Sequence, residues 1–227
     1  MRRETFKKGS ENYVEWLKSL GCIMYAPLRE DLQDRISGNS FVPTKDGAYA
    51  LENGYCEVTV PSTVPASPLN ITIPALSTTT SKDYTVMCEA QLVQKSVADN
   101  SCRLLLFGNQ AVYSESAPQY FANPYPTSLA YFPSAYGNLG WVTGVTKTAR
   151  VYSYNNNAFI YYVDGAFLAV SYGNVFDITA MSSPYNQGFT LGCSGHENFR
   201  NCKFRVRDLM FFTAALDLAT IKRVQEL

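Results

Sequence analysis

The sequence lacks an excess of charge of either sign, a long hydrophobic run and more than one histidine. Its 19 Lys and Arg residues balance 19 Asp and Glu residues, so the formal net charge is zero at neutral pH. Nucleic acid is therefore not an expected partner, because proteins that bind it need a basic surface. No apolar run reaches the about 18 residues that a membrane-spanning helix requires, so we expect no membrane partner either.

The only histidine, His196, lies between Cys193 and Cys202 in a polar loop. A structural zinc site needs four ligands at recognisable spacing, and this loop lacks a fourth ligand and a Cys-x-x-Cys pair. We therefore predict two free thiols here and no metal, with zinc as the alternative. His196 also has no recognisable nucleophile motif beside it, which argues against serine or cysteine nucleophile catalysis.

The start of the chain does not have the pattern of an export signal. Arg2 and Arg3 are followed by charged and small residues instead of an apolar run. We expect synthesis in the cytoplasm, unless an engineered start has replaced a removed leader. In a reducing compartment the six cysteines should mostly be small buried residues. If the chain reaches an oxidising space, Cys193 and Cys202 are the first pair to test.

Apolar side chains are abundant, at 46% of the 227 residues, and 14% of the residues are aromatic. Such a chain can bury a large core without metal or disulfide. Near its start, Ser10 can cap an amphipathic helix that Gly21 ends. The apolar face of this helix carries Tyr13, Trp16, Leu17 and Leu20. We expect residues 1–21 to form an arm and a helix that packs on the body or docks a partner subunit, and residues 22–227 to form one domain.

After residue 21 the pattern changes to short β-branched and aromatic runs separated by Gly, Pro, Asn and Asp, which is typical of an all-β sandwich. Alternation predicts a strand over Asp83–Val93. Further strands are expected at residues 104–107, 149–154, 159–163, 167–170 and 189–192. The middle three form consecutive hairpins, because Asn155–Asn157 and Asp164–Gly165 are turn sequences.

The last segments predict a strand and a helix. The strand runs over Phe204–Phe212, and a slip in its alternation predicts a bulge near Arg207 and Asp208. Asp217 is placed to cap the helix that follows, and Ile221 and Val224 lie on its buried side.

Three groups of residues carry a family resemblance. They are Tyr162-Val163-Asp164-Gly165 with the apolar strand after it, Phe189-Thr-Leu191-Gly192, and the run from Phe204 to Ile221. In order and spacing they resemble the laminin-G-like (LamG/pentraxin-type) branch of the concanavalin A-like lectin/glucanase superfamily. Tyr25-Ala-Pro-Leu28 and the loop after it resemble the opening of that branch, so the resemblance spans about residues 22–227.

This resemblance implies a jelly-roll β-sandwich of two antiparallel sheets, with one concave face that often binds glycans or proteins. With the helices expected near both ends, the fold class is all-β with a short N-terminal and a short C-terminal helix.

Catalytic members of that superfamily carry two carboxylates on one strand, because glycoside cleavage needs them about 5.5 to 9.5 Å apart. Their Glu-x-Asp-x-x-Glu signature is absent: the acidic run Glu30–Asp34 is loop-like, and Glu52 and Glu57 flank Gly54. We therefore predict a chain without catalytic residues, which is not an enzyme. A glycoside-active hydrolase, or a lyase that uses one of the 16 tyrosines as base, is the alternative.

Calcium is common at the rim of related modules, where hard oxygen ligands gather on loops. Asp31, Asp34 and Asn39 could supply such oxygens. Short acidic loops usually bond their own backbone instead, so we expect no cofactor, with calcium as the alternative.

The stretch from Tyr113 to Trp141 is rich in aromatic residues and proline. Aromatic rings suit the C–H face of a sugar ring, and proline stiffens a loop before it binds. We predict that the ligand contacts are Tyr120, Tyr125, Tyr131, Tyr136 and Trp141. The alternative is that these side chains only pin a long loop to the body of the protein.

These observations together predict a non-catalytic binding or structural module that recognises a glycan or a protein. Folds of this kind usually work outside cells, yet no leader is visible. A bacteriophage or prophage virion component fits both facts, because virions assemble in the cytosol and leave by lysis. The arm would then attach the domain to a neighbouring subunit. A homo-oligomer that buries Tyr120 to Trp141 between chains is a third interpretation.

Overall fold

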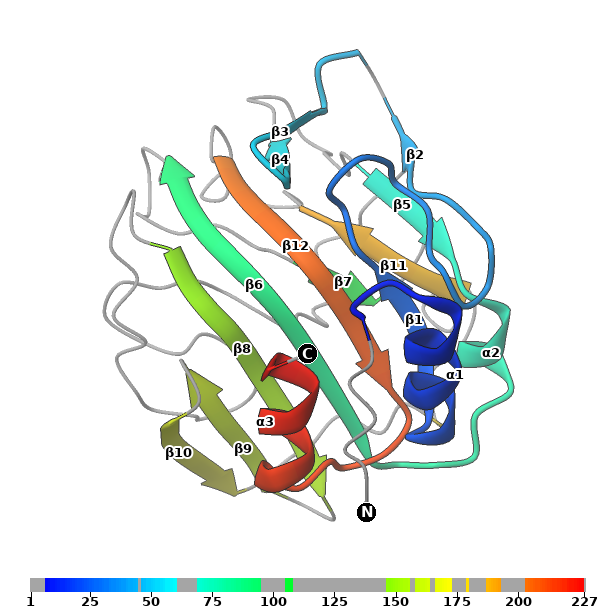
Figure 1. Ribbon diagram of the computed structural model, residues 1–227, viewed down its shortest axis with the longest axis vertical. Helices are drawn as coiled ribbons and strands as arrows, with labels where there is room; N and C mark the ends of the chain where they lie inside the picture. Colours follow the sequence, from blue (N-terminus) through cyan, green and yellow to red (C-terminus); the bar gives the residue numbers. More distant parts are fainter. Residues whose placement is uncertain are drawn as a thin grey trace.

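The structure is a computed structural model, and it describes residues 7–44, 46–60, 69–94, 105–107, 146–155, 158–163, 166–172, 179, 187–192 and 203–226. These residues form two antiparallel sheets and three helices (Figure 1).

The large sheet contains eight strands. In spatial order they are β10 (Ala166–Tyr172), β9 (Ala158–Val163), β8 (Thr146–Asn155), β6 (Tyr84–Gln94), β12 (Lys203–Phe212), β4 (Tyr55–Thr59) and β3 (Tyr49–Glu52), and β1 (Cys22–Ala26) also pairs with β12. The small sheet has the order β2 (Val42–Pro43), β5 (Leu69–Thr72), β11 (Gly188–Leu191) and β7 (Leu105–Phe107).

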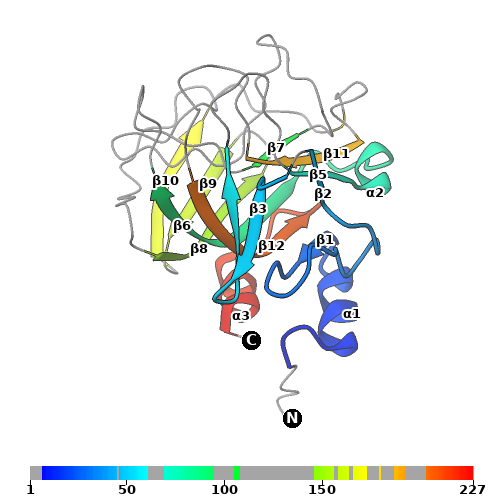
Figure 2. The same ribbon diagram turned by 90° about the horizontal axis from the view of Figure 1, so that it is seen from above.

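A core of apolar side chains fills the space between the two sheets. Phe211 of β12 lies at its centre, with its ring centroid 4.9 Å from that of Phe189 in the small sheet and 5.8 Å from that of Tyr84. Val58 and Leu69 belong to the same cluster from opposite sheets. The two layers are seen edge-on in Figure 2. The predicted all-β sandwich of two antiparallel sheets is confirmed.

The first and last helices pack on the outer face of the large sheet, away from the small sheet (Figure 2). Helix α1 (Glu11–Ser19) and helix α3 (Leu218–Glu226) bury a second apolar cluster against it. That cluster includes Tyr13, Leu17, Met87, Met210, Phe212, Ile221 and Val224. The apolar face of α1 therefore covers this chain's own sheet. A one-turn helix, α2 (Pro74–Ser77), follows β5.

Both predicted helix caps are confirmed. The Ser10 hydroxyl accepts a hydrogen bond from the Tyr13 N–H at 3.3 Å, and the Asp217 carboxylate accepts one from the Thr220 N–H at 2.7 Å. Gly21 follows α1 with a φ of 84°, a conformation that glycine adopts without steric cost. No helix among the described residues is long and apolar enough to cross a membrane.

The predicted hairpins are also present. Asn155 pairs with Ala158, and Val163 pairs with Ala166, so two residues connect each pair of strands. The connecting residues Asn156, Asn157, Asp164 and Gly165 lie outside the described residues, and Asn155, expected in the turn, is the last residue of β8.

The predicted bulge divides β12 into two halves. The register with β6 shifts between Arg207 and Met210, and Asp208 has a φ of 50°. Before the bulge β12 pairs with β4, and after it β12 pairs with β1. Because the bulge adds one residue, the outward-facing positions shift from odd to even numbers. Arg205 and Arg207 face outward before it, and Met210 and Phe212, which the helices cover, face outward after it.

Candidate functional site

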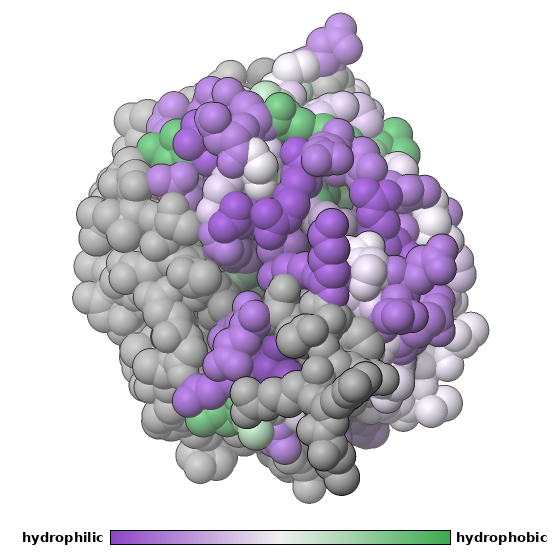
Figure 3. All heavy atoms as spheres, viewed as in Figure 1, coloured by the Kyte–Doolittle hydropathy of each residue, from purple (hydrophilic) through white to green (hydrophobic). Residues whose placement is uncertain are grey.

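Where the helices do not cover it, the outer face is polar in the part whose side chains the structure describes. Its side chains come from four adjacent strands: Glu52 of β3, Tyr55 and Glu57 of β4, Glu89 of β6, and Lys203, Arg205 and Arg207 of β12. We call these seven residues the charged face. Figure 3 views this side of the molecule, where hydrophilic residues cover much of the described surface.

The strand register brings opposite charges together. Arg205 pairs with Glu57 across β12 and β4, and Arg207 pairs with Glu89 across β12 and β6. Residues directly opposite each other on antiparallel strands lie on the same face and are in contact. The alternate basic residues of β12 therefore contact acidic residues of its two neighbouring strands, β4 and β6.

Glu57 is the centre of the first group of ion pairs. The residue is 8% exposed, and its carboxylate accepts from Arg205 Nε at 2.9 Å and from Lys203 Nζ at 3.3 Å. Arg205 also approaches Glu52, with 4.0 Å between Nη2 and Oε1. Charge-assisted bonds of this kind fix side chains in one geometry.

The second group joins Tyr55, Glu89 and Arg207. Arg207 Nη2 lies 2.6 Å from Glu89 Oε1, and the Tyr55 hydroxyl donates to the same oxygen. The Arg207 guanidinium lies over the Tyr55 ring, 4.3 Å from its centroid. The Nε atom of Arg207 is buried and has no hydrogen-bond partner in the described part of the chain.

This arrangement is suited to hydrogen bonding with a ligand that has many hydroxyl groups. Each guanidinium has five N–H donors and each carboxylate about four acceptor positions, so the ion pairs leave part of this capacity unused. The groups stand on strands rather than loops, and rigid elements hold a binding geometry without an ordering cost.

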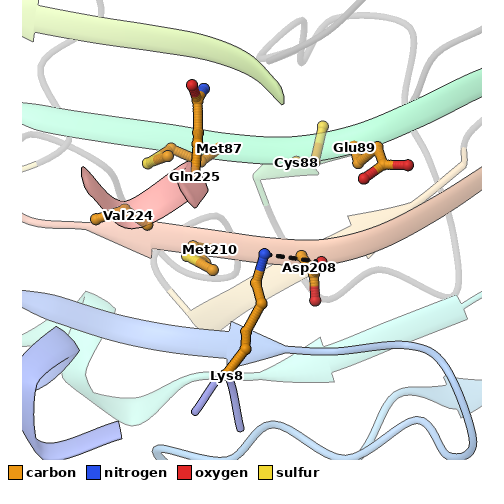
Figure 4. A pocket seen from close by; sticks show the side chains of 8 residues that line it. All are labelled: Lys8, Met87, Cys88, Glu89, Asp208, Met210, Val224 and Gln225. Carbon is orange, nitrogen blue, oxygen red and sulfur yellow. Dashed lines mark ion pairs between the residues drawn. The ribbon is translucent and has the colours of Figure 1, made fainter. Parts of the chain in front are cut away.

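A cavity of about 50 Å³ lies beside the charged face, where the bulge, the N-terminal arm and α3 meet (Figure 4). Asp208, which is 5% exposed, points to it from the bulge. Its carboxylate binds Arg29 Nη2 at 2.5 Å and Lys8 Nζ at 3.2 Å. Glu89 belongs to both the charged face and the wall of this cavity.

The three residues considered for calcium lie in the loop after β1, where their polar groups bond the protein itself. Asp34 is fully buried and accepts from the N–H groups of Tyr25, Ile36 and Ser37 at 2.7, 3.1 and 3.0 Å. Asn39 donates to the Thr72 carbonyl at 2.7 Å.

Asp31 accepts from the Gln33 N–H at 3.0 Å and from Arg35 Nη2 at 2.7 Å. Burial acts to raise the pKa of Asp31, but these two bonds outweigh it and the pKa is lowered. Among the described residues, no group of three or more His, Cys, Asp or Glu side chains is arranged to hold a metal ion.

Three of the six cysteines are described. Cys22, Cys56 and Cys88 are buried and form no disulfide, and the sequence predicted burial for most of the cysteines. Burial raises the pKa of the Cys56 thiol to about 12, so this thiol is protonated at neutral pH and a poor nucleophile.

The predicted ligand contacts Tyr120, Tyr125, Tyr131, Tyr136 and Trp141 lie outside the described residues, and so does the loop with Cys193, His196 and Cys202. These remain predictions. The charged face was not predicted, although the alternate basic residues of the terminal strand were a signal for it. Sequence alone does not show which acids stand opposite them.

No protein-family model and no curated protein matches the sequence. Solved structures do match, with TM-scores near 0.6. A sialidase of Trypanosoma rangeli has a TM-score of 0.60 at 13% identity, over 89% of this chain and 32% of that one. Botulinum neurotoxin type C, in a study of its interaction with two ganglioside molecules, has a TM-score of 0.60 at 11% identity. The match covers 92% of this chain and 52% of that one.

A third structure matches over its whole length. Domain 4 of AbnA, a GH43 extracellular arabinanase from Geobacillus stearothermophilus, was solved in complex with arabinotriose. It has a TM-score of 0.57 at 16% identity, over 90% of this chain and 98% of that one. By contrast, this chain spans about a third of the length of the sialidase. The likenesses show that the chain has the jelly-roll-like β-sandwich fold of these domains.

The prediction that this chain is not an enzyme is corrected by these comparisons. It rested on the missing pair of carboxylates on one strand. The structures that the chain resembles include a sialidase and a domain of an arabinanase, both glycoside-acting enzymes. The fold thus occurs within enzymes of this class, so a missing strand signature is not sufficient to exclude the chain from it.

Proposed function

We propose that this chain is a glycan-binding domain. The observation that carries the proposal is its likeness to a complete arabinanase domain, 98% of which is matched and which was solved with a bound trisaccharide. The sialidase was also solved with sialic acid, and the type C neurotoxin depends on gangliosides for cell entry. Three proteins that contain this fold, each associated with a glycan, favour the same class of ligand here.

The charged face is the part of the described surface that we propose for the glycan. It offers donors, acceptors and the Tyr55 ring on four adjacent strands, and sugar hydroxyls are both donors and acceptors. Tyr120, Tyr125, Tyr131, Tyr136 and Trp141 remain our proposed stacking contacts, because flat apolar rings complement the C–H face of a sugar.

We further propose that the domain belongs to the laminin-G-like branch of the concanavalin A-like superfamily and is displayed on a larger assembly, such as a virion. The expected consequence is that the native particle has a mass well above the 25.3 kDa of one chain. Mass measurement of that particle tests this part of the proposal.

Binding of the labelled full chain to a glycan array tests the function. The array carries arabino-oligosaccharides, sialylated ganglioside sugars and neutral controls. We expect Arg205→Gln to weaken binding about tenfold or more, because a hydrogen bond to a charged group contributes about 1.5 to 3 kcal/mol. Lys222→Ala, which removes an exposed lysine of α3 away from the charged face, is the matched control and should bind as the wild type does.

Tyr125→Ala and Trp141→Ala test the aromatic contacts in the same assay. Lost binding with an unchanged melting temperature supports recognition. A lowered melting temperature instead supports the interpretation that these rings anchor a loop.

Protein recognition is a second candidate function. It is favoured by one further match, the binding domain of botulinum neurotoxin DC in complex with rat synaptotagmin II, which has a TM-score of 0.57 over 91% of this chain. A chain that binds no arrayed glycan but binds a protein with the charged face would favour this candidate.

A further inference from the structure

The cavity beside the charged face contains an ammonium group that the chain itself supplies. Lys8 extends from the N-terminal arm across the sheet and places its Nζ atom 3.2 Å from Asp208 (Figure 4). An observed occupant shows which chemistry a site accepts. Here the occupant is a primary ammonium on an alkyl chain, held by a carboxylate that is almost fully buried.

The rest of the lining complements the same chemistry. Glu89 contributes a second carboxylate, and the apolar side chains of Met87, Met210 and Val224 form the neighbouring wall. Carboxylates bind the ammonium group, and apolar walls pack against methylene groups, as lysine side chains require. Two carboxylates in the wall disfavour an anionic ligand. The described residues also offer no third ligand for a metal ion.

Lys8 is partly exposed and can be displaced. Its side chain is 27% exposed and its Nζ makes one ion pair among the described residues, with Asp208, so the ammonium regains contact with water when it leaves. Asp208 keeps its bidentate bonds to Arg29 when Lys8 leaves, because Nε and Nη2 bind its two oxygens at 3.3 and 2.5 Å. Departure of Lys8 therefore does not leave a buried carboxylate unpaired.

The cavity also has unfilled space next to the ammonium. Its volume of about 50 Å³ is several times the about 10 to 15 Å³ that one water molecule needs. The buried Nε2 atom of Gln225, at the wall, has no partner among the described residues.

We propose that this cavity is a recognition site for an alkylammonium group of the lysine type, which Lys8 occupies from within the chain. The ligand is a lysine side chain of a partner, which replaces Lys8 and shifts the arm off the sheet. This proposal does not depend on the proposed glycan function, although Glu89 belongs to both the cavity wall and the charged face.

Chemical rescue of Lys8→Ala tests the proposal. n-Butylammonium at 100 mM should raise the melting temperature of this variant by about 3 °C, as expected for a weak ligand at about ten times its dissociation constant. Tetramethylammonium at the same concentration controls for salt, because it cannot donate a hydrogen bond. The wild-type protein, whose site is occupied, should show no difference between the two salts.

Three further arms make the result decisive. The double variant Lys8→Ala/Asp208→Asn should lose the difference between the salts. Asp208 lies at the bulge, so the double variant can fail to fold. The methionine methyl signals of the single variant Lys8→Ala are therefore followed by NMR as a second readout. n-Butylammonium should move the signals of Met87 and Met210, which line the cavity, and leave that of Met24 in the main core unchanged.

Glucosamine carries its ammonium on a sugar ring that is too large for the cavity. It should therefore raise the melting temperature of Lys8→Ala less than n-butylammonium does. The proposal would be overturned if both salts changed the melting temperature of Lys8→Ala equally, or if glucosamine raised it more than n-butylammonium does. Met87 and Met210 methyl signals that do not move would also overturn it.

Discussion

Single carboxylates determine much of the local structure. Asp34 organises the loop after β1 by accepting three backbone N–H bonds, one of them from Tyr25 within β1. Asp208 does the same for the bulge, where it gathers the arm and the loop of Arg29 around one buried charge. Both are buried acids whose bonds compensate the loss of hydration.

Asp34→Ala should lower the free energy of unfolding by about 3 kcal/mol, since it leaves buried N–H groups without an acceptor. Asp34→Asn keeps one acceptor oxygen and should lower the free energy of unfolding less than Asp34→Ala does. Urea denaturation measures both. If the loop instead held calcium, EDTA would lower the melting temperature of the wild-type protein, and we expect no change.

Residue-scale predictions from the sequence succeeded where the signal is local. The caps Ser10 and Asp217 act within three residues along the chain, so the sequence around them contains the whole interaction. The partners of Glu57 do not follow from sequence in this way. They stand about 150 residues away and depend on which strands become neighbours.

At the scale of elements, β12 organises the large sheet. It pairs with β6 on one side, and with β4 and then β1 on the other, and its bulge separates the open charged half from the half that the helices cover. The slip in alternation made this bulge predictable. The short strands β2 to β5 were not predicted individually, because their runs of two to five residues show no period. Equally short strands were predicted only where the run was apolar and a turn sequence followed it, as at residues 104–107.

The pairing of β11 with β5 offers a test at this scale. A Cβ atom at Gly188 would lie 1.9 Å from the Ile71 carbonyl oxygen, so no side chain fits between these strands. Gly188→Ala should cost about 3 kcal/mol of stability. Gly47→Ala is the control: that turn glycine has a φ of 73° but open space around it, and its substitution should cost about 1 kcal/mol. Equal costs in urea denaturation would contradict the packing that we describe.

The whole molecule is a sandwich with a second, smaller core on its outer face. Sequence patterns predicted the sandwich because strand alternation and turn residues recur along the chain. They did not predict that α1 and α3 share one apolar cluster, since this requires both ends of the chain to meet on the same sheet. The Arg223 guanidinium lies 5.0 Å from the centroid of the Trp16 ring and joins the two helices directly.

Alkaline pH should destabilise the whole molecule. Burial raises the pKa values of Tyr13, Tyr25, Cys22 and Cys56 above their ordinary values of 10.0 and 9.0. The unfolded chain therefore releases these protons first, so the stabilisation is complete below about pH 9 and is lost progressively as the pH rises. For Cys56 the loss extends from pH 9 to about 12.

Urea denaturation between pH 7 and 10.5 measures this loss. Tyr13→Phe should show a smaller decrease than the wild type, because it removes one of the titrating groups. A free energy of unfolding that stays constant to pH 10.5 would contradict the burial of these groups.

Glycan binding by the charged face is the central claim, and NMR mapping of a bound glycan tests it most directly. Arabinotriose, or the strongest ligand from the array, is titrated into the ¹⁵N-labelled full chain. We expect the largest shifts at the amides of Glu57, Glu89 and Arg205, with little change in the small sheet. Saturable binding whose shifts lie on β5 and β11, or no binding to any arrayed glycan, would contradict the account.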